Sequence, residues 1–110
     1  MAYDEQLAAR IRDIVTGEPG VSERKMFGGL AFLVNGNMAV AASHEGGILL
    51  HVDPEQTEAL LAEPFTDPFV MRGRRMAGWL RVLPEGLEDD ADLERWAGLG
   101  ITYARGLPPK

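Results

Sequence analysis

The sequence contains no cysteine, which excludes disulfide bonds, thiolate metal sites and cysteine nucleophiles. It also has no apolar run near the roughly 20 residues that a membrane-spanning helix needs. Its N-terminus is acidic and lacks both a basic start and an apolar stretch, so we expect no secretory signal. These absences favour a cytoplasmic protein with no membrane partner.

Charge is unevenly distributed along the chain. The formal net charge of -6 opposes simple attraction to nucleic acid. Residues 68–84 nevertheless contain no acid, whereas residues 85–94 contain several acids and no base. The arginines of the first stretch are Arg72, Arg74, Arg75 and Arg81. This stretch is either a solvated basic hairpin or a basic surface for an anionic partner.

A strong hairpin signal lies in the middle of the chain. Asn35-Gly36 tolerates the positive φ of a type I′ turn, and apolar residues flank it on both sides. We predict strands near 26–34 and 37–42, with Phe32 opposite Ala39. One face then carries Leu30, Phe32, Val34 and Ala39, and the other carries Ala31, Leu33, Met38 and Val40. Both faces are apolar, so helices must cover one, and more chain or a second subunit must cover the other.

The remaining periodicities predict an α+β fold of one domain, residues 1–110. The expected order is α-β-β-β-α-β-β-α, an antiparallel sheet of about five strands flanked by helices. We expect helices over 3–16, 53–62 and 90–105, and further strands over 48–52, 69–72 and 76–83, with a turn at Gly73-Arg74. Asp89 or Asp90 caps the last helix, whose predicted buried stripe is Leu93, Trp96, Ala97, Gly100, Ile101 and Ala104.

The chain carries two motifs, and with them it resembles the TfoX (Sxy) N-terminal domain family over essentially its whole length. They are Lys25-Met26-Phe27-Gly28-Gly29 before the hairpin and Met76-x-x-Trp79 in a late strand. The resemblance implies a fold similar to type III secretion chaperones, which dimerise and bind partner polypeptides. It also implies regulation of natural competence genes, together with the cyclic-AMP receptor protein. Full-length regulators carry a second domain, so we expect a stand-alone N-terminal domain here.

No catalytic, cofactor or metal site is expected. The resemblance supplies no catalytic residue set. Gly28-Gly29 lacks the frame of a phosphate-binding loop, so we interpret the pair as a bulge or a close backbone approach. His51 with Asp53, and His44 with Glu45, lack the spacing of a metal site. Neither Ser22 nor Ser43 lies in a nucleophile elbow.

The best candidate interaction patch combines Arg72, Arg74, Arg75 and Trp79. Arg and Trp dominate interface energetics, and Arg pairs with carboxylates or phosphates. The competing interpretation places Trp79 in the core and the arginines at an exposed hairpin tip. Four methionines, Met26, Met38, Met71 and Met76, are expected in the core.

Three hypotheses about function follow. The first is a non-enzymatic regulatory or adaptor domain that binds a protein partner and forms a homodimer. The second is a DNA-binding accessory domain that uses the basic hairpin 68–84. The third is a small-molecule-binding protein or an unrecognised enzyme, with a pocket near Gly28, Trp79 and His51.

Overall fold

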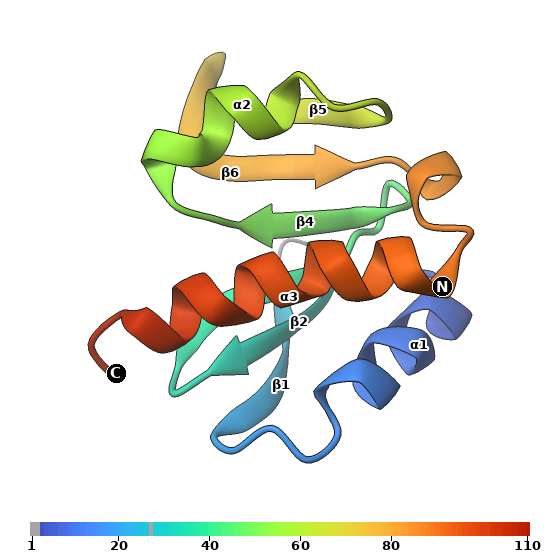
Figure 1. Ribbon diagram of the computed structural model, residues 1–110, viewed down its shortest axis with the longest axis vertical. Coiled ribbons are helices and arrows are strands. Elements are labelled where there is room, and N and C mark those ends of the chain that lie inside the picture. The colour runs from blue at the N-terminus through green and yellow to red at the C-terminus, as the bar shows by residue number, and fades with distance from the viewer. Residues whose placement is uncertain (1–2, 27) are drawn as a thin grey trace.

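The computed structural model of this protein describes residues 3–26 and 28–110. Helices and strands follow one another along the chain in nearly the predicted order (Figure 1). The elements are α1 (Glu5–Val15), β1 (Val21–Met26), β2 (Gly29–Val34), β3 (Asn37–Ala42), β4 (Ile48–His51), η1 (Pro54–Gln56), α2 (Thr57–Leu61), β5 (Thr66–Met71), β6 (Arg74–Val82), η2 (Pro84–Gly86) and α3 (Asp90–Gly106), where η1 and η2 are single turns of 3₁₀ helix.

The strands form one antiparallel six-stranded sheet in the order β1-β2-β3-β4-β6-β5. The α+β class is therefore confirmed, but the prediction of about five strands misses β1. Residues 22–25 of this edge strand are all exposed. Because none of these side chains is buried, β1 lacks the alternation of apolar and polar residues by which a strand is recognised.

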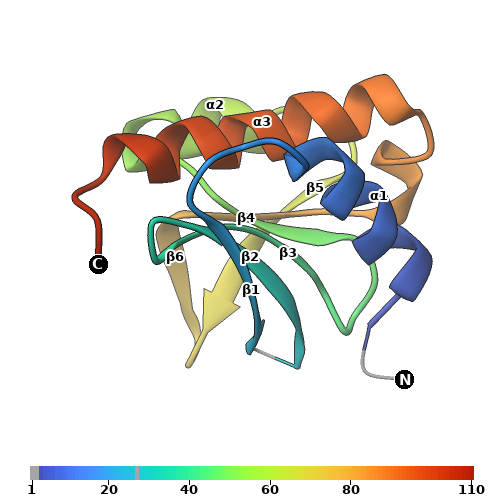
Figure 2. The same cartoon turned by 90° about the horizontal axis from the view of Figure 1, so that it is seen from below.

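The three helices lie on one face of the sheet (Figure 2). Both ends of the sheet, β1–β2 and β5–β6, bend away from the helices in this view. Within the described part of the chain, no helix combines the length and the apolar character that crossing a membrane requires.

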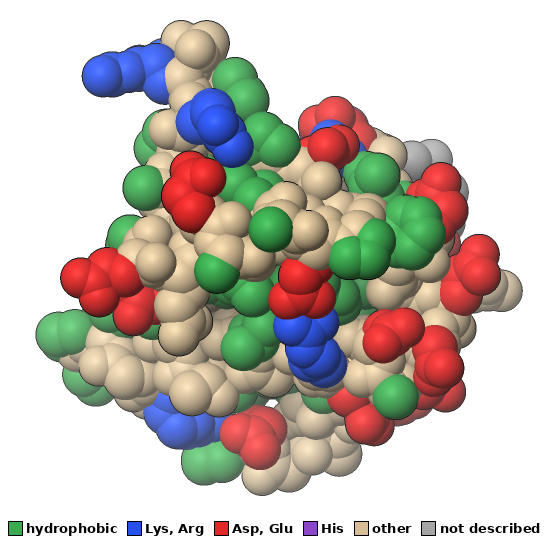
Figure 3. Space-filling view, turned by 45° about the horizontal axis from the view of Figure 1, so that its top comes forward, with side chains coloured by type: hydrophobic (Ala, Val, Ile, Leu, Met, Phe, Trp, Pro, Cys, Tyr) green, Lys and Arg blue, Asp and Glu red, His purple; other side chains and the backbone are tan. Residues whose placement is uncertain are grey.

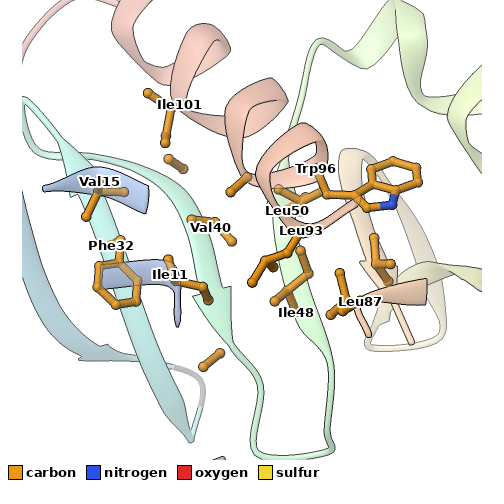
Figure 4. Packing of buried hydrophobic residues seen from close by; sticks show 14 of the residues in the cluster. Ile11, Val15, Phe32, Val40, Ile48, Leu50, Leu87, Leu93, Trp96 and Ile101 are labelled. Atoms are coloured by element: carbon orange, nitrogen blue, oxygen red, sulfur yellow. The ribbon is translucent and has the colours of Figure 1, made fainter. Parts of the chain in front are cut away.

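Helix α3 supplies much of the main core, and its predicted stripe is confirmed. All six stripe residues are buried. In Figure 4, Leu93, Trp96 and Ile101 extend from α3 toward the strands. A Cβ atom at Gly100 would lie 2.3 Å from the carbonyl oxygen of Ala39, so only glycine permits this approach of helix to sheet.

Aspartates cap α1 and α3, and the cap of α3 is one of the two aspartates that the sequence predicts. The Asp4 carboxylate accepts a hydrogen bond from the backbone N–H of Gln6 at 2.9 Å. Asp89, rather than Asp90, caps α3 by accepting from the N–H of Ala91 at 3.0 Å. These bonds satisfy backbone donors that have no partner inside the helix.

The β2–β3 turn is confirmed, with φ of 52° at Asn35 and 85° at Gly36. The predicted register holds only next to the turn. A bulge between Phe32 and Leu33 places Phe32 opposite Val40 rather than Ala39. Val40 therefore packs in the main core under the helices and not on the opposite face as predicted.

The second face of the sheet is covered by the chain itself. A second cluster, as we call it, packs there and consists of the buried residues Ala31, Leu33, Met38, Ala41 and Leu49 with the partly buried Met26, Phe69 and Trp79. Because these side chains come from both bent ends of the sheet and from its middle, the curvature encloses them. This face therefore does not require a second subunit.

Candidate functional site

The tip of the β5–β6 hairpin differs from the predicted turn by one residue. Arg72 and Gly73 have φ of 54° and 77°, so they form the turn, and β6 already begins at Arg74. Positive φ at two consecutive positions is typical of a type I′ hairpin turn. Arg74 pairs with Met71 and Arg75 with Val70 across the hairpin.

Apolar side chains are exposed beside these arginines. The exposed fractions are 53% for Val70 and 37% each for Met71 and Met76. The prediction that all four methionines lie in the core is therefore wrong for Met71 and Met76, although Met26 and Met38 do join the second cluster. We call Val70, Met71, Arg72, Arg74, Arg75 and Met76 the hairpin surface.

A large irregularity separates the hairpin surface from the rest of the sheet. Pro68 pairs with Leu80, yet Val70 pairs with Arg75, so residues 76–79 of β6 lie opposite the single residue 69. Gly78 adopts a φ of 86° within this bulge. Because a bulge bends its strand, the tip of the hairpin projects from the molecule (Figure 1). Pro68 is tolerated in β5 because this strand lies at the edge of the sheet.

Basic and apolar side chains share this projection in the space-filling view. The projecting tip, at the upper left of Figure 3, carries Lys or Arg side chains beside hydrophobic ones. Acidic side chains are most numerous on the right of the same view, and a few also lie near the tip. The structure thus brings Arg72, Arg74 and Arg75 together on one projecting element, as the sequence predicted.

Ion pairing distinguishes these three arginines from most of the others. Arg10 pairs with Asp90 and Arg105 with Glu18, both at 2.9 Å, and Arg95 pairs with Glu63. Arg12 donates two hydrogen bonds to the Glu23 carboxylate, which lowers the pKa of Glu23 below its usual value. Arg81 lies 3.7 Å from Glu45.

Arg72, Arg74 and Arg75 take part in none of the ion pairs between residues that the structure describes. The chain has more acidic than basic residues, so these arginines are unpaired within its described part although carboxylates are in excess. Their charges are available to an external partner.

Trp79 lies between the hairpin surface and the core. Its ring stacks on His51, with centroids 4.1 Å apart and an interplanar angle of 10°, and it contacts Phe69 at 6.2 Å. The same side chain lines a small pocket together with Arg75 and Met76. The interpretation of Trp79 as a core residue is thus partly right, since only one side of it packs in the second cluster.

Contacts with neighbouring residues hold the ring of His51 in place. Its Nδ1 lies 3.1 Å from the carbonyl oxygen of Met38, which accepts the hydrogen bond, and Tyr103 meets the ring edge-on at 5.0 Å. Burial lowers the pKa of His51 below 6.5; the Met38 carbonyl opposes this shift and Lys110 adds to it. Sequence reasoning missed Tyr103, because nothing in the helical pattern of α3 marks its contact with β4.

The other candidate ligands do not come together. The Asp53 carboxylate accepts from the N–H of Glu55 at 2.9 Å, and so caps η1. The Ser43 hydroxyl oxygen accepts from the N–H of Glu45 at 3.2 Å within the β3–β4 turn. Over residues 3–26 and 28–110, no group of three or more His, Cys, Asp or Glu side chains is placed to hold a metal ion.

In the described part of the family motif, the two glycines serve the path of the backbone. Lys25 is exposed on β1, and Phe27 lies outside the described residues. Gly28 has a φ of 76° between β1 and β2. A Cβ atom at Gly29 would lie 2.1 Å from the carbonyl oxygen of Ala42, which confirms the predicted close backbone approach.

A comparison with protein families identifies the class of domain. The model of the TfoX N-terminal domain matches residues 13–104, from within α1 to near the end of α3. The chain belongs to the TfoX N-terminal domain family. A search of curated proteins finds no match. Membership supports a regulatory domain of this type, and the family is not known for enzymatic activity.

Proposed function

We propose that this TfoX N-terminal domain is a non-enzymatic regulatory adaptor that binds another protein through its hairpin surface. The observation that carries the proposal is the arrangement at residues 70–76. Three exposed apolar side chains, Val70, Met71 and Met76, flank three arginines that have no carboxylate partner among the described residues. Exposed apolar groups flanked by charge mark protein interaction sites more often than they mark ordinary surface.

The physical properties of the two residue types support a protein partner. Burying the exposed parts of Val70, Met71 and Met76 against a partner removes apolar area from water, which favours association. Met is flexible and adapts to the shape of a partner, and Arg is enriched at interface centres. The arginines would also orient an acidic partner as it approaches.

The proposed process is transcriptional control of the competence type, in the cytoplasm. Family membership is what supports this part of the proposal. In this process the adaptor would act by contact with another regulator and would need no bound cofactor.

DNA binding is the second candidate, and the same three arginines favour it. Two observations weigh against it. The chain carries a net charge of -6. In addition, apolar Val70, Met71 and Met76 share the surface, and phosphate contacts make no use of such side chains.

A homodimer is the alternative to a different protein as the occupant of the hairpin surface. Because the second cluster is covered within one chain, the exposed apolar part of the hairpin surface is the area that a second copy would cover. Sedimentation equilibrium of the purified protein separates this arrangement from binding of a different protein. A dimer that dissociates in Val70→Asp would place the second copy on the hairpin.

Capture from native lysate tests the proposed function. The baits are the wild type, a variant with Arg72, Arg74 and Arg75 each changed to Glu, and Arg24→Glu as the matched control on exposed β1. We expect one protein to be retained by the wild type and by Arg24→Glu and to be lost from the triple variant. Equal retention by all three baits contradicts the proposal. Nuclease-sensitive nucleic acid that elutes with salt establishes the DNA alternative instead.

A further inference from the structure

A small pocket adjoins the hairpin surface, between α2 and β6. It has a volume of about 210 Å³. Its lining residues are Pro54, Thr57, Glu58, Leu61, Pro68, Arg75, Met76, Ala77 and Trp79. Figure 1 shows that α2 lies over the β5–β6 end of the sheet. Arg75 and Met76 therefore belong both to the pocket and to the hairpin surface.

Buried hydrogen bonds hold the pocket walls in place. The Thr57 hydroxyl oxygen accepts from the N–H of Gly78 at 2.9 Å, and this contact is buried. The Gly78 carbonyl in turn accepts from the N–H of Val52 at 2.8 Å. Asp53 fixes the start of η1, next to Pro54. Because the Thr57–Gly78 contact ties α2 to β6, two walls of the pocket are held together within the chain itself.

The size and lining of the pocket suit one apolar side chain. Sites that enclose a whole small molecule measure about 300–1,000 Å³, which is larger than this pocket. Two prolines, Leu61, Met76 and Trp79 provide apolar walls. A single Leu or Phe side chain would fill such a space and would bury the exposed part of Met76. A centrally buried apolar anchor is the usual source of affinity when a short segment binds.

Charge at the rim indicates what flanks this anchor. Arg75 lines the pocket, and Arg74 and Arg72 continue from it to the hairpin tip. None of these cations pairs with a carboxylate among residues 3–26 and 28–110. Glu58 is the one acid in the lining and is an exposed residue of α2, which packs against β6. A segment that passes from the pocket to the tip therefore meets mostly positive charge.

We propose that the α2–β6 pocket is the anchor site for an apolar side chain of an acidic partner segment, whose carboxylates pair with the hairpin arginines. The inference rests on the proposed function, because it names the kind of segment that the adaptor binds. Burial of the anchor side chain supplies affinity, and the carboxylate–guanidinium pairs set the direction in which the segment runs.

Selection from a displayed library of random short peptides tests this assignment. We expect the wild-type protein to enrich peptides that carry one large apolar residue next to Asp or Glu. Ala77→Leu would place a bulky side chain in the pocket and should weaken the selected peptides about tenfold or more. Ala91→Leu, at an exposed site on α3 outside the pocket, is the matched control and should leave binding unchanged.

Charge variants provide a second test, because they should change the affinity for the selected peptides in opposite directions. Glu58→Gln removes the opposing carboxylate at the rim and should strengthen the selected peptides about two- to threefold. Arg75→Glu should weaken them more than Arg24→Glu does. Thermal unfolding of each variant shows whether it is folded before its affinity is compared.

The outcomes separate the pocket from the proposed function. If Ala77→Leu binds as the wild type does while Arg75→Glu loses binding, the hairpin surface stands and the anchor pocket is wrong. Enrichment of basic peptides, or of none, also overturns the pocket. If the lysate partner is retained when all three hairpin arginines are Glu, the proposed function itself fails.

Discussion

The β2–β3 and β5–β6 hairpins have the same kind of turn and opposite surroundings. Asn35-Gly36 and Arg72-Gly73 both have two consecutive positive φ angles. Every residue of β2 and β3 is buried, whereas the outer half of β5–β6 is exposed. Strands β2 and β3 have neighbours on both sides, and β5 is at an edge. The comparison teaches that turn chemistry determines that a hairpin forms, and that its place in the sheet decides its role.

The largest difference between the hairpins should be in packing energy. Phe32→Ala should lower the free energy of unfolding by about 3–5 kcal/mol, because it leaves a cavity under the helices. Val70→Ser, at an exposed site, should change it by about 0.5 kcal/mol or less. Urea unfolding followed by tryptophan fluorescence measures both. Similar losses from the two variants would mean that the β5–β6 tip is packed in solution.

The bulge in β6 provides the next test. Gly78→Ala should lower the free energy of unfolding by about 2–3 kcal/mol, because alanine disfavours the positive φ and its Cβ atom would be crowded by its neighbours. The added Cβ atom would lie 3.2 Å from both Pro54 Cγ and the Val52 carbonyl oxygen. Gly73→Ala has a similar φ but no atom within 4 Å, so it should cost about 1 kcal/mol. Equal midpoints in urea for the two variants would contradict a role for the bulge in fixing the hairpin.

Exchanging residues between the two turns should produce effects of opposite sign. Asn35→Arg should lower stability by about 1 kcal/mol, because Asn tolerates the left-handed region better than Arg does. Arg72→Asn should raise stability by about 0.5 kcal/mol for the same reason. Thermal unfolding of each variant measures the sign. A stabilising Arg72→Asn that also loses the lysate partner would show that Arg72 is kept for binding.

The smallest predicted effect is a pH dependence at His51, where the hairpin meets the central strands. The pKa of folded His51 lies below its ordinary value of 6.5, so the unfolded chain binds a proton first as pH falls. The contribution of neutral His51 to the free energy of unfolding should therefore be fully present above about pH 6.5 and should decline below it.

Urea midpoints at about pH 7.5 and 5.5 should show this decline in the wild type and a smaller one in His51→Gln. His44→Gln, at the exposed histidine of the β3–β4 turn, serves as the control. An unchanged decline in His51→Gln would assign the pH dependence to other groups.

Elements with strong local signals could be predicted from sequence. The stripe of α3 follows helical periodicity, and Asp89 caps it. In contrast, β1 was missed because its exposed residues have no apolar pattern. The start of β5 was placed three residues late, at residue 69 rather than Thr66, since Pro68 suggests a loop until β5 is known to be an edge strand. The sequence predicts the hairpin that carries the candidate arginines, but it wrongly assigns the exposed Met71 and Met76 to the core.

The sequence by itself determined the α+β class, the hairpin turns, the helix caps and the grouping of arginines, because each depends on neighbouring residues. Only the tertiary structure decided that the curved sheet covers its own second face, since that requires residues from both ends of the sheet to pack against one cluster. It also decided which arginines find carboxylates. The α2–β6 pocket likewise needs residues far apart in the chain to approach, and no local pattern encodes that approach.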